Sequence, residues 1–243
     1  MAPQNGAPEW LTSIHYAHRG LHSQTVPENS LKGAERAIEA RLGIECDVQC
    51  SRDGTAFVFH DFELDRLTNA SGDIGDCPDA KLASLSLLGT DQSPIPLSDF
   101  LVGIAGRVPV LIEVKSKPEF NVAPTCESVL AALETYADHC AVMSFDPRVP
   151  EWFRSRSPKT CCGLVGTDSY SNGFETVWRD PDIIDRAHPD FLAIDSRDLA
   201  RPEAAQWRAS GRPLLSWTIK TKAQWEIALP LTDALIAEGE ALT

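Results

Sequence analysis

The sequence lacks any apolar run that approaches the roughly 20 residues of a membrane-spanning helix. It also has few basic residues, because 22 Lys and Arg stand against 35 Asp and Glu and give a formal net charge of −13. This balance argues against a nucleic-acid partner and against a polybasic membrane anchor, since both need clustered Lys and Arg. The N-terminal residues show neither the basic nor the apolar region of a secretory signal. We therefore expect a cytoplasmic protein without stable membrane insertion.

Neither the cysteines nor the short catalytic motifs searched for in the sequence point to a function. The seven cysteines are odd in number and show no zinc-type spacing, so we expect buried, reduced thiols. The sequence contains none of the G-x-x-x-x-G-K-[ST], G-x-G-x-x-G, G-x-S-x-G or H-E-x-x-H patterns. The nucleotide-binding, serine-hydrolase and zinc-protease classes that depend on those motifs find no support here.

What the chain does have is a regular alternation of apolar runs and helix-like stretches. No repeat or low-complexity linker interrupts residues 1–243, so we predict a single domain. Helix-like stretches include 30–40, 124–136 and 202–210. Eight apolar runs lie at 15–20, 43–50, 108–115, 141–145, 162–165, 191–195, 213–219 and 234–237. Strands that alternate with helices of about 10–15 residues form parallel sheets, and eight such units predict a (β/α)8 TIM barrel of the α/β class.

One further apolar run, residues 56–60, follows the second predicted strand too closely for a parallel crossover, which needs a dozen or more residues. The Asp53-Gly54 pair before it is a strong hairpin signal. We therefore predict an antiparallel β-hairpin after the second strand. Such a hairpin brings His60 roughly level with Glu45 and Asp47.

The last predicted strand, 234–237, is followed by few residues. Only residues 238–243 remain, too few for a covering helix, so we expect a truncated C-terminus. An apolar stripe would then stay exposed along this strand, and such a stripe usually marks an interface. Either the N-terminal segment around Trp10 and Leu11 covers it, or a second copy of the chain does so in a homodimer.

Acidic side chains share one face of the second predicted strand. Because side chains alternate between the two faces of a strand, Glu45, Asp47 and Gln49 point the same way. Glu113 and Lys115 share a face of the third predicted strand. Three inward carboxylates need a positive partner, and a hard divalent cation would satisfy them through oxygen. A carboxylate–lysine network with Lys115, or a place on the surface, would explain the same pattern.

Two histidines accompany these carboxylates. His18 and Arg19 lie at the end of the first predicted strand, where barrel enzymes place catalytic groups. His60, followed by Asp61, lies at the end of the predicted hairpin. Two histidines near a cation and an arginine indicate acid–base chemistry on an anion, because arginine matches phosphate oxygens. A lone histidine is more often structural, and the sequence does not assign which of the two is acid and which is base.

Together these residues resemble the glycerophosphodiester phosphodiesterase family. The resemblance is carried by His18-Arg19-Gly20, Pro27-Glu28-Asn29-Ser30, Gly43-Ile44-Glu45-x-Asp47-Val48, Asp53-Gly54, His60-Asp61, Leu64-Asp65-Arg66-x-Thr68, Ile112-Glu113-x-Lys115, Ser144-Phe145-Asp146 and Ser216-Trp217-Thr218. Any single piece is weak, whereas the combination, in family order over most of the chain, is specific. It implies a TIM-barrel hydrolase that cleaves small-molecule glycerophosphodiesters to sn-glycerol 3-phosphate and an alcohol.

The resemblance also implies roles for individual residues. By the family pattern, Glu45, Asp47 and Glu113 would hold one divalent cation, Mg²⁺ or Ca²⁺. His18 and His60 would be the acid–base pair.

Four further residues receive roles in substrate binding from the same resemblance. Arg19 and Lys115 would contact phosphate, and Phe145 and Trp217 would line the glycerol pocket. For Trp217, simple barrel packing is the alternative.

Two other functions stay open at this stage. One is a related barrel enzyme that releases lysophospholipid or sphingolipid head groups in the manner of a phospholipase D. The other is a catalytically silent barrel that binds phosphodiesters. The presence of both histidines and all three carboxylates favours an active hydrolase over the silent barrel.

Overall fold

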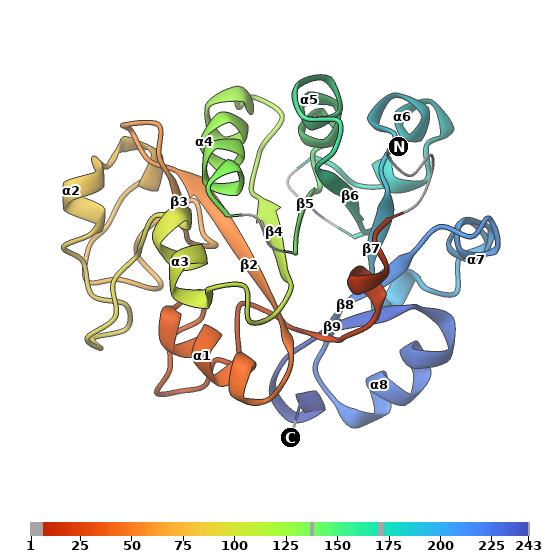
Figure 1. Cartoon of the computed structure of the whole chain (residues 1–243), viewed down its shortest axis with the longest axis horizontal. Helices are drawn as coiled ribbons and strands as arrows, with labels where there is room; N and C mark the ends of the chain where they lie inside the picture. The colour runs from red at the N-terminus through yellow and green to blue at the C-terminus, as the bar shows by residue number, and fades with distance from the viewer. Residues whose placement is uncertain (1–6, 137–138, 170–172, 243) are drawn as a thin grey trace. The chain divides into compact units, whose positions relative to one another are not determined.

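The computed structural model describes residues 7–136, 139–169 and 173–242. Within these residues the sheet has nine strands in the order β1-β9-β8-β7-β6-β5-β4-β2-β3, and β1 also pairs with β2 (Figure 1). The second pairing closes a ring and leaves β3 outside it. The strands are β1 (Tyr16–Ala17), β2 (Gly43–Cys50), β3 (Ala56–Val58), β4 (Val110–Val114), β5 (Cys140–Ser144), β6 (Cys161–Gly166), β7 (Phe191–Asp195), β8 (Leu214–Ile219) and β9 (Ala234–Ala237). The prediction of a TIM barrel with a hairpin after the second strand is confirmed.

Helices separate most of the strands along the chain. They are α1 (Leu31–Glu39), α2 (Asp79–Leu82), α3 (Leu97–Ile104), α4 (Ala123–Glu134), α5 (Arg148–Arg156), α6 (Pro181–Ala187), α7 (Pro202–Ala209) and α8 (Lys222–Ala228). Local signals explain where several begin. Ser30 caps α1 by accepting a hydrogen bond from Gly33 N at 3.1 Å, and Thr221 and Gln224 form a capping box at the start of α8.

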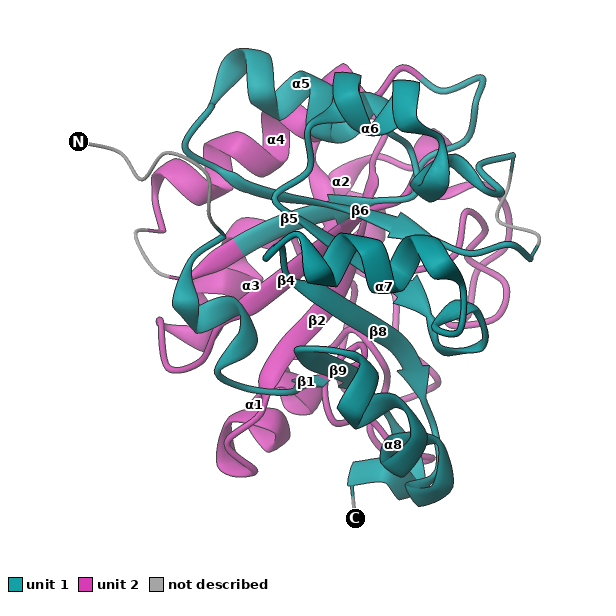
Figure 2. Ribbon diagram, turned by 90° about the vertical axis from the view of Figure 1, so that its right-hand side faces the viewer, with its two compact units in different colours: residues 1–16, 116–120, 141–243 teal, residues 17–115, 121–140 magenta. Residues whose placement is uncertain are grey.

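The residue contacts divide the chain into two compact units (Figure 2). Unit 1 contains residues 1–16, 116–120 and 141–243, and unit 2 contains residues 17–115 and 121–140. That residues 1–243 fold as one domain stays a prediction. No helix among the described residues is both long enough and apolar enough to span a membrane.

In unit 2, strand β2 pairs in parallel with β4 and antiparallel with β3. Helices α1 and α4 pack against β2, and α3 packs against β3 (Figure 1). The apolar residues of β2, such as Ile44, Cys46 and Val48, are fully buried. The β2–β3 register pairs Val48 with Val58 and Cys50 with Ala56, so continuation of this register sets His60 opposite Cys46, between Glu45 and Asp47.

The predicted bounds of several strands were too long; the third predicted strand, 108–115, is confined to Val110–Val114. The first strand is confined to Tyr16–Ala17 because Arg19 and Gly20 adopt positive φ values of 58° and 75°, which extended strands exclude. The hairpin strand ends at Val58, although Phe59 N still donates to Asp47 O at 2.9 Å.

The expectation of an exposed apolar stripe along the last strand was wrong. All four residues of β9 are buried in unit 1. The short 3-10 helix Gly239–Leu242 follows the strand, and Leu242 packs against the buried apolar cluster that contains Leu235 and Ala237. The N-terminal segment contributes as well. Leu11 is fully buried, and His15 Nδ1 accepts a hydrogen bond from Leu235 N at 3.1 Å. His15 therefore ties the N-terminal segment to β9. Docking of residues 8–11 on this strand and a homodimer stay predictions.

Candidate active site

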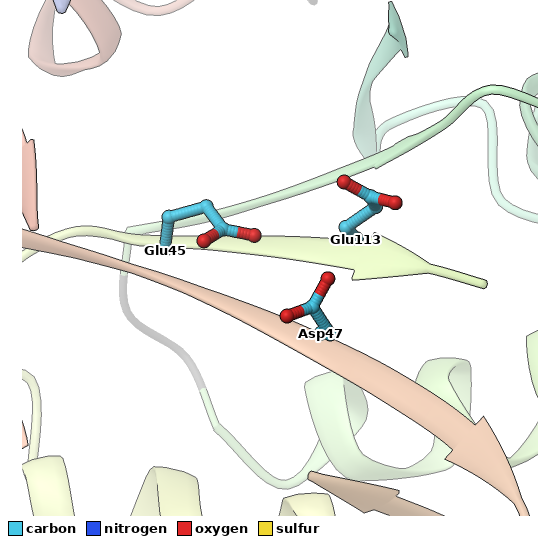
Figure 3. Close-up of side chains that lie close together, drawn as sticks. All are labelled: Glu45, Asp47 and Glu113. Carbon is cyan, nitrogen blue, oxygen red and sulfur yellow. The ribbon is translucent and has the colours of Figure 1, made fainter. Parts of the chain in front are cut away.

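Three carboxylates from β2 and β4 form the centre of the candidate site. The parallel register places Asp47 beside Glu113, and Glu45 lies two residues earlier on the same face of β2. One oxygen from each carboxylate lies within 4.8 Å of the other two (Figure 3). All three residues are buried, so their negative charges have little access to water. This grouping was predicted from the alternation of side chains.

The carboxylate of Glu45 shows that this group suits a cation. Burial raises the pKa of Glu45 well above its ordinary value, and the nearby charges of Asp47 and Glu113 raise it further. Among the described residues, Glu45 Oε1 is a buried oxygen without a hydrogen-bond partner. A buried oxygen of this kind is unfavourable unless something positive binds it. The donor set, three carboxylates with one unsatisfied oxygen, fits a hard divalent cation.

Asp47 is held in its ionised form by its surroundings. Burial opposes ionisation, but the positive charges of His60 and Arg19 outweigh it and keep the pKa of Asp47 below its ordinary range. Asn29 Nδ2 donates to Asp47 Oδ2 at 2.9 Å, and Asn29 Oδ1 accepts from Asp47 N at 3.1 Å. Asp47 therefore offers a fixed carboxylate at the centre of the group.

The turn after β1 brings His18 and Arg19 to the carboxylates. The positive φ of Arg19 lets its backbone N donate to Glu45 Oε2 at 3.0 Å. The guanidinium of the same residue pairs with Asp47, with Nε 3.3 Å from Oδ2. His18 Nε2 lies 3.9 Å from Glu45 Oε2, and the side chain is only 14% exposed. The structure thus brings the predicted histidine and arginine together with the acidic group.

His60 joins the group from the end of the hairpin. Its Nδ1 lies 2.6 Å from Asp61 Oδ1, and its Nε2 lies 3.3 Å from Lys115 Nζ. A hydrogen bond from the Lys115 ammonium to Nε2 goes with a proton on Nδ1, which Nδ1 then donates to Asp61. Gln49 Nε2 donates to the His60 carbonyl at 3.0 Å and fixes the backbone. These contacts hold the His60 ring in a fixed orientation, with Nδ1 toward Asp61 and Nε2 toward Lys115.

Lys115 lies directly against the acidic group. Its Nζ lies 2.7 Å from Glu113 Oε1 and 3.6 Å from Asp47 Oδ1. Burial alone would lower the pKa of Lys115, but the charges of Glu113 and Asp47 raise it above its ordinary value. The carboxylate–lysine network considered from the sequence is therefore present. The network leaves Glu45 Oε1 without a partner among the described residues, so this oxygen is available to a cation.

Four residues beside this group had no role assigned from the sequence. Asn29 fixes Asp47, and Glu28, Asp61 and Arg66 form ion pairs around Arg19 and His60. The signals that could have pointed to them were the Pro27-Glu28-Asn29 and Leu64-Asp65-Arg66 pieces of the family pattern.

Phe145 and Trp217, the residues expected to line a glycerol pocket, lie in unit 1. Their rings contact each other edge to face, with centroids 5.3 Å apart and planes at 85°. Trp217 Nε1 donates to Ala193 O at 3.0 Å, so the indole is anchored to β7. Their role in binding glycerol stays a prediction.

Comparison with known proteins identifies the family. The sequence profile of the Glycerophosphoryl diester phosphodiesterase family matches residues 18–235. The chain belongs to this family. Family membership agrees with the resemblance drawn from the motifs.

Individual relatives of this family differ in how much of the chain they match. YqiK of Bacillus subtilis is 35% identical over 113 residues, which are 44% of this chain and 46% of that protein. The glycerophosphodiester phosphodiesterase of Caldanaerobacter subterraneus is 48% identical over 67 residues, 27% of each chain. The chain thus spans less than half the length of these two relatives. YhdW of Bacillus subtilis matches more fully, with 26% identity over 92% of this chain and 97% of that protein.

Solved structures of family members share the fold. An Oleispira antarctica phosphodiesterase, solved in complex with its product sn-glycerol-3-phosphate, has a TM-score of 0.80 at 20% identity, and 92% of each chain is covered. A glycerophosphodiester phosphodiesterase from Agrobacterium tumefaciens has a TM-score of 0.75 at 23% identity, and the match covers 94% of this chain and 97% of that one. At these identities the likeness concerns the barrel fold.

Proposed function

We propose that this protein hydrolyses glycerophosphodiesters to sn-glycerol 3-phosphate and an alcohol, with one divalent cation, Mg²⁺ or Ca²⁺. The observation that carries the proposal is the buried group of Glu45, Asp47 and Glu113 with two histidines beside it. Family membership supports the choice of reaction, because the matching profile covers residues 18–235. The product named for the Oleispira antarctica relative supports the choice of substrate class.

In this proposal Glu45, Asp47 and Glu113 hold the cation. The unsatisfied Oε1 of Glu45 supports that assignment. When bound, the cation would supply Lewis-acid stabilisation of the charge that develops on the non-bridging phosphate oxygens.

The positive side chains of the chain bind and orient the phosphate in this proposal. Arg19 and Lys115 both reach the carboxylates, Arg19 through Asp47 and Lys115 through Glu113. Their guanidinium and ammonium groups would contact the anionic diester and stabilise its transition state.

Proton transfer in this proposal falls to His18 and His60. The Nδ1 contact with Asp61 leaves His60 Nε2 able to take up a proton, which suits a general base. His18, next to Glu45, would exchange a proton with the leaving alcohol or with the attacking hydroxyl. Assistance of this kind contributes roughly 10²–10⁴-fold to the rate.

The remaining substrate contacts in this proposal come from aromatic rings. Phe145 and Trp217 would line the glycerol pocket, and their edge-to-face contact supports an aromatic wall.

A direct assay tests the proposal. The purified chain, freed of metal by dialysis, is supplied with Mg²⁺ or Ca²⁺ and with glycerophosphocholine or glycerophosphoethanolamine, and glycerol 3-phosphate is followed by ³¹P NMR. We expect metal-dependent release of glycerol 3-phosphate. Release of choline from lysophosphatidylcholine or sphingomyelin, without cleavage of the glycerophosphodiesters, would favour the head-group-releasing alternative. Binding without turnover of any of these would favour the silent barrel.

A further inference from the structure

Arg66 forms hydrogen bonds with two carboxylates, and each carboxylate contacts a different residue of the candidate active site. The two carboxylates are Glu28, which pairs with Arg19, and Asp61, which pairs with His60. Arg66 lies 38 residues from Glu28 in the chain and five residues from Asp61. Its place between them therefore depends on the fold and is not a local contact.

The Glu28 side of this network is a shared carboxylate. Arg66 Nη1 donates to Glu28 Oε2 at 2.9 Å, and Arg66 Nη2 donates to Glu28 Oε1 at 2.9 Å. Arg19 Nη1 donates to the same Oε1 at 2.8 Å. The fork of Arg66 thus fixes the plane of the carboxylate that orients the guanidinium of Arg19.

The Asp61 side has the same design. Arg66 Nε donates to Asp61 Oδ2 at 2.6 Å, and Arg66 Nη2 donates to Asp61 Oδ1 at 3.0 Å. Oδ1 is also the oxygen that lies 2.6 Å from His60 Nδ1. Arg66 therefore fixes the carboxylate that sets the ring orientation and the tautomer of His60.

Arg66 is the most solvent-exposed of the three residues in this network. The Arg66 side chain is 49% exposed, whereas Glu28 is 12% and Asp61 is 22% exposed. Surface ion pairs usually contribute little to stability, so a stability role alone does not account for four charge-assisted hydrogen bonds at this position.

We propose that Arg66 is a positioning residue. It holds the side chains of His60 and Arg19 at fixed positions relative to each other, through Asp61 and Glu28. This proposal rests on the proposed function of the same site. A planar guanidinium can donate two hydrogen bonds to each of the two carboxylates, whereas an ammonium presents its three donors from a single atom and cannot form both pairs. Loss of this fork leaves both carboxylates free to rotate, and a misplacement of about 1 Å can lower the rate about 10²-fold.

The test compares Arg66→Met and Arg66→Lys with a matched control, Arg107→Met. Arg107 is 41% exposed and also forms two hydrogen bonds with a glutamate, Glu35, at 2.9 and 2.8 Å. We expect both Arg66 variants to lower kcat and raise KM for glycerophosphocholine, with a combined loss of about 10–100-fold in kcat/KM. The control variant should keep the wild-type values, and thermal unfolding should change no more for the Arg66 variants than for the control.

Two further variants separate positioning from a general structural role. Asp61→Asn should lower mainly kcat, and Glu28→Gln should raise mainly KM, because each breaks one side of the network. Adding Arg66→Met to Asp61→Asn should cause no further loss of kcat, since the same contact is already lost.

The outcomes distinguish the two proposals. An active wild type with Arg66 variants that match Arg107→Met, or with independent, multiplicative effects of Arg66→Met and Asp61→Asn, would overturn the positioning role and leave the proposed function intact. A wild type that does not hydrolyse glycerophosphodiesters would overturn the proposed function and this inference with it. Arg66→Lys keeps the charge and most of the side-chain volume, so it decides the matter if Arg66→Met fails to fold.

Discussion

Asn29 and Asp47 hold each other through two opposed hydrogen bonds. The Asn29 amide donates to the Asp47 carboxylate, and the Asp47 backbone N donates to the Asn29 carbonyl oxygen. Asn29 is almost fully buried and has a φ of 56°, a conformation that asparagine tolerates better than most residues. Asn29, together with Arg19 and Lys115, therefore fixes the direction of the central carboxylate.

The first prediction concerns this pair. Asn29→Gly keeps the positive φ accessible but leaves the buried Asp47 N without its acceptor. We expect unfolding free energy to fall by about 1–3 kcal/mol, the usual effect of an unsatisfied buried donor, and cation affinity to fall as well. Denaturant unfolding and calorimetric metal titration measure the two effects. Unchanged metal affinity would mean that Asn29 does not orient Asp47 for the cation.

The second prediction concerns the cation. EDTA should abolish activity, and Glu113→Gln should raise the metal concentration needed for half-maximal activity at least about tenfold, because one of three anionic ligands is lost. Activity measured against metal concentration tests this. Glu35→Gln on the exposed face of α1 provides the control. Full activity of Glu113→Gln at low micromolar metal would remove Glu113 from the site.

The third prediction concerns the histidine pair. His18→Ala and His60→Ala should each lower kcat at least about 10²-fold with folding intact, and the double variant should be little worse than either single one. The reason is that two groups that act in one proton relay fail together. Steady-state kinetics with far-UV circular dichroism test this, and the exposed His188→Asn provides the control. Multiplicative losses would show that the two residues do not share one step.

The fourth prediction concerns the attacking group. The glycerol 2-hydroxyl lies next to the phosphoester, and its intramolecular attack would avoid an entropy cost that can reach about 7–11 kcal/mol. One histidine would deprotonate this hydroxyl as it attacks phosphorus, and the other would protonate the head-group alcohol as its P–O bond breaks, which leaves a cyclic phosphate. Water would then open the cyclic phosphate with the histidine roles reversed. A 2-O-methylated diester should then inhibit competitively without being cleaved, and bis(p-nitrophenyl) phosphate should be a poor substrate. Rapid turnover of the methylated diester would show direct attack by water.

The fifth prediction concerns stability at low pH. Burial lowers the pKa of His15 below its ordinary value, and neutral His15 accepts the hydrogen bond from Leu235 N. The unfolded chain binds this proton more readily, so the contribution of neutral His15 is complete above pH of about 6.5 and is lost as the pH falls through the lowered pKa of the folded state. His15→Asn, whose side-chain oxygen can accept the same bond, should flatten the fall in unfolding midpoint between about pH 7 and 5. His188→Asn should leave that fall as it is in the wild type, and an equal slope for His15→Asn would refute the assignment.

The acidic part of the site could be predicted because it depends on local geometry. Strand β2 is regular, so alternation alone places Glu45 and Asp47 on one face, and the Asp53-Gly54 turn fixes the register that returns His60 to them. These relationships involve neighbours in the chain or a single hairpin. The apolar periodicity of the other runs was likewise enough to give the barrel.

The parts that were missed depend on contacts between distant segments. The turn at Arg19 ends β1 early because of left-handed backbone angles that the apolar pattern does not encode. The Glu28–Arg66 pair joins residues that are 38 positions apart, and surface arginines have many possible partners in a sequence. Strand β9 is contacted by His15 near the start of the chain, and Leu242 near its end packs on the apolar cluster that contains Leu235 and Ala237.

The proposed ion-binding, proton-transfer and phosphate-binding side chains all come from residues 18–115, within unit 2. This grouping has a use in directed evolution. A gene library that randomises only codons 141–242 leaves every one of those charged groups encoded as it is. In a selection for activity on new head groups, no clone of this library is then lost because one of those charged residues was mutated.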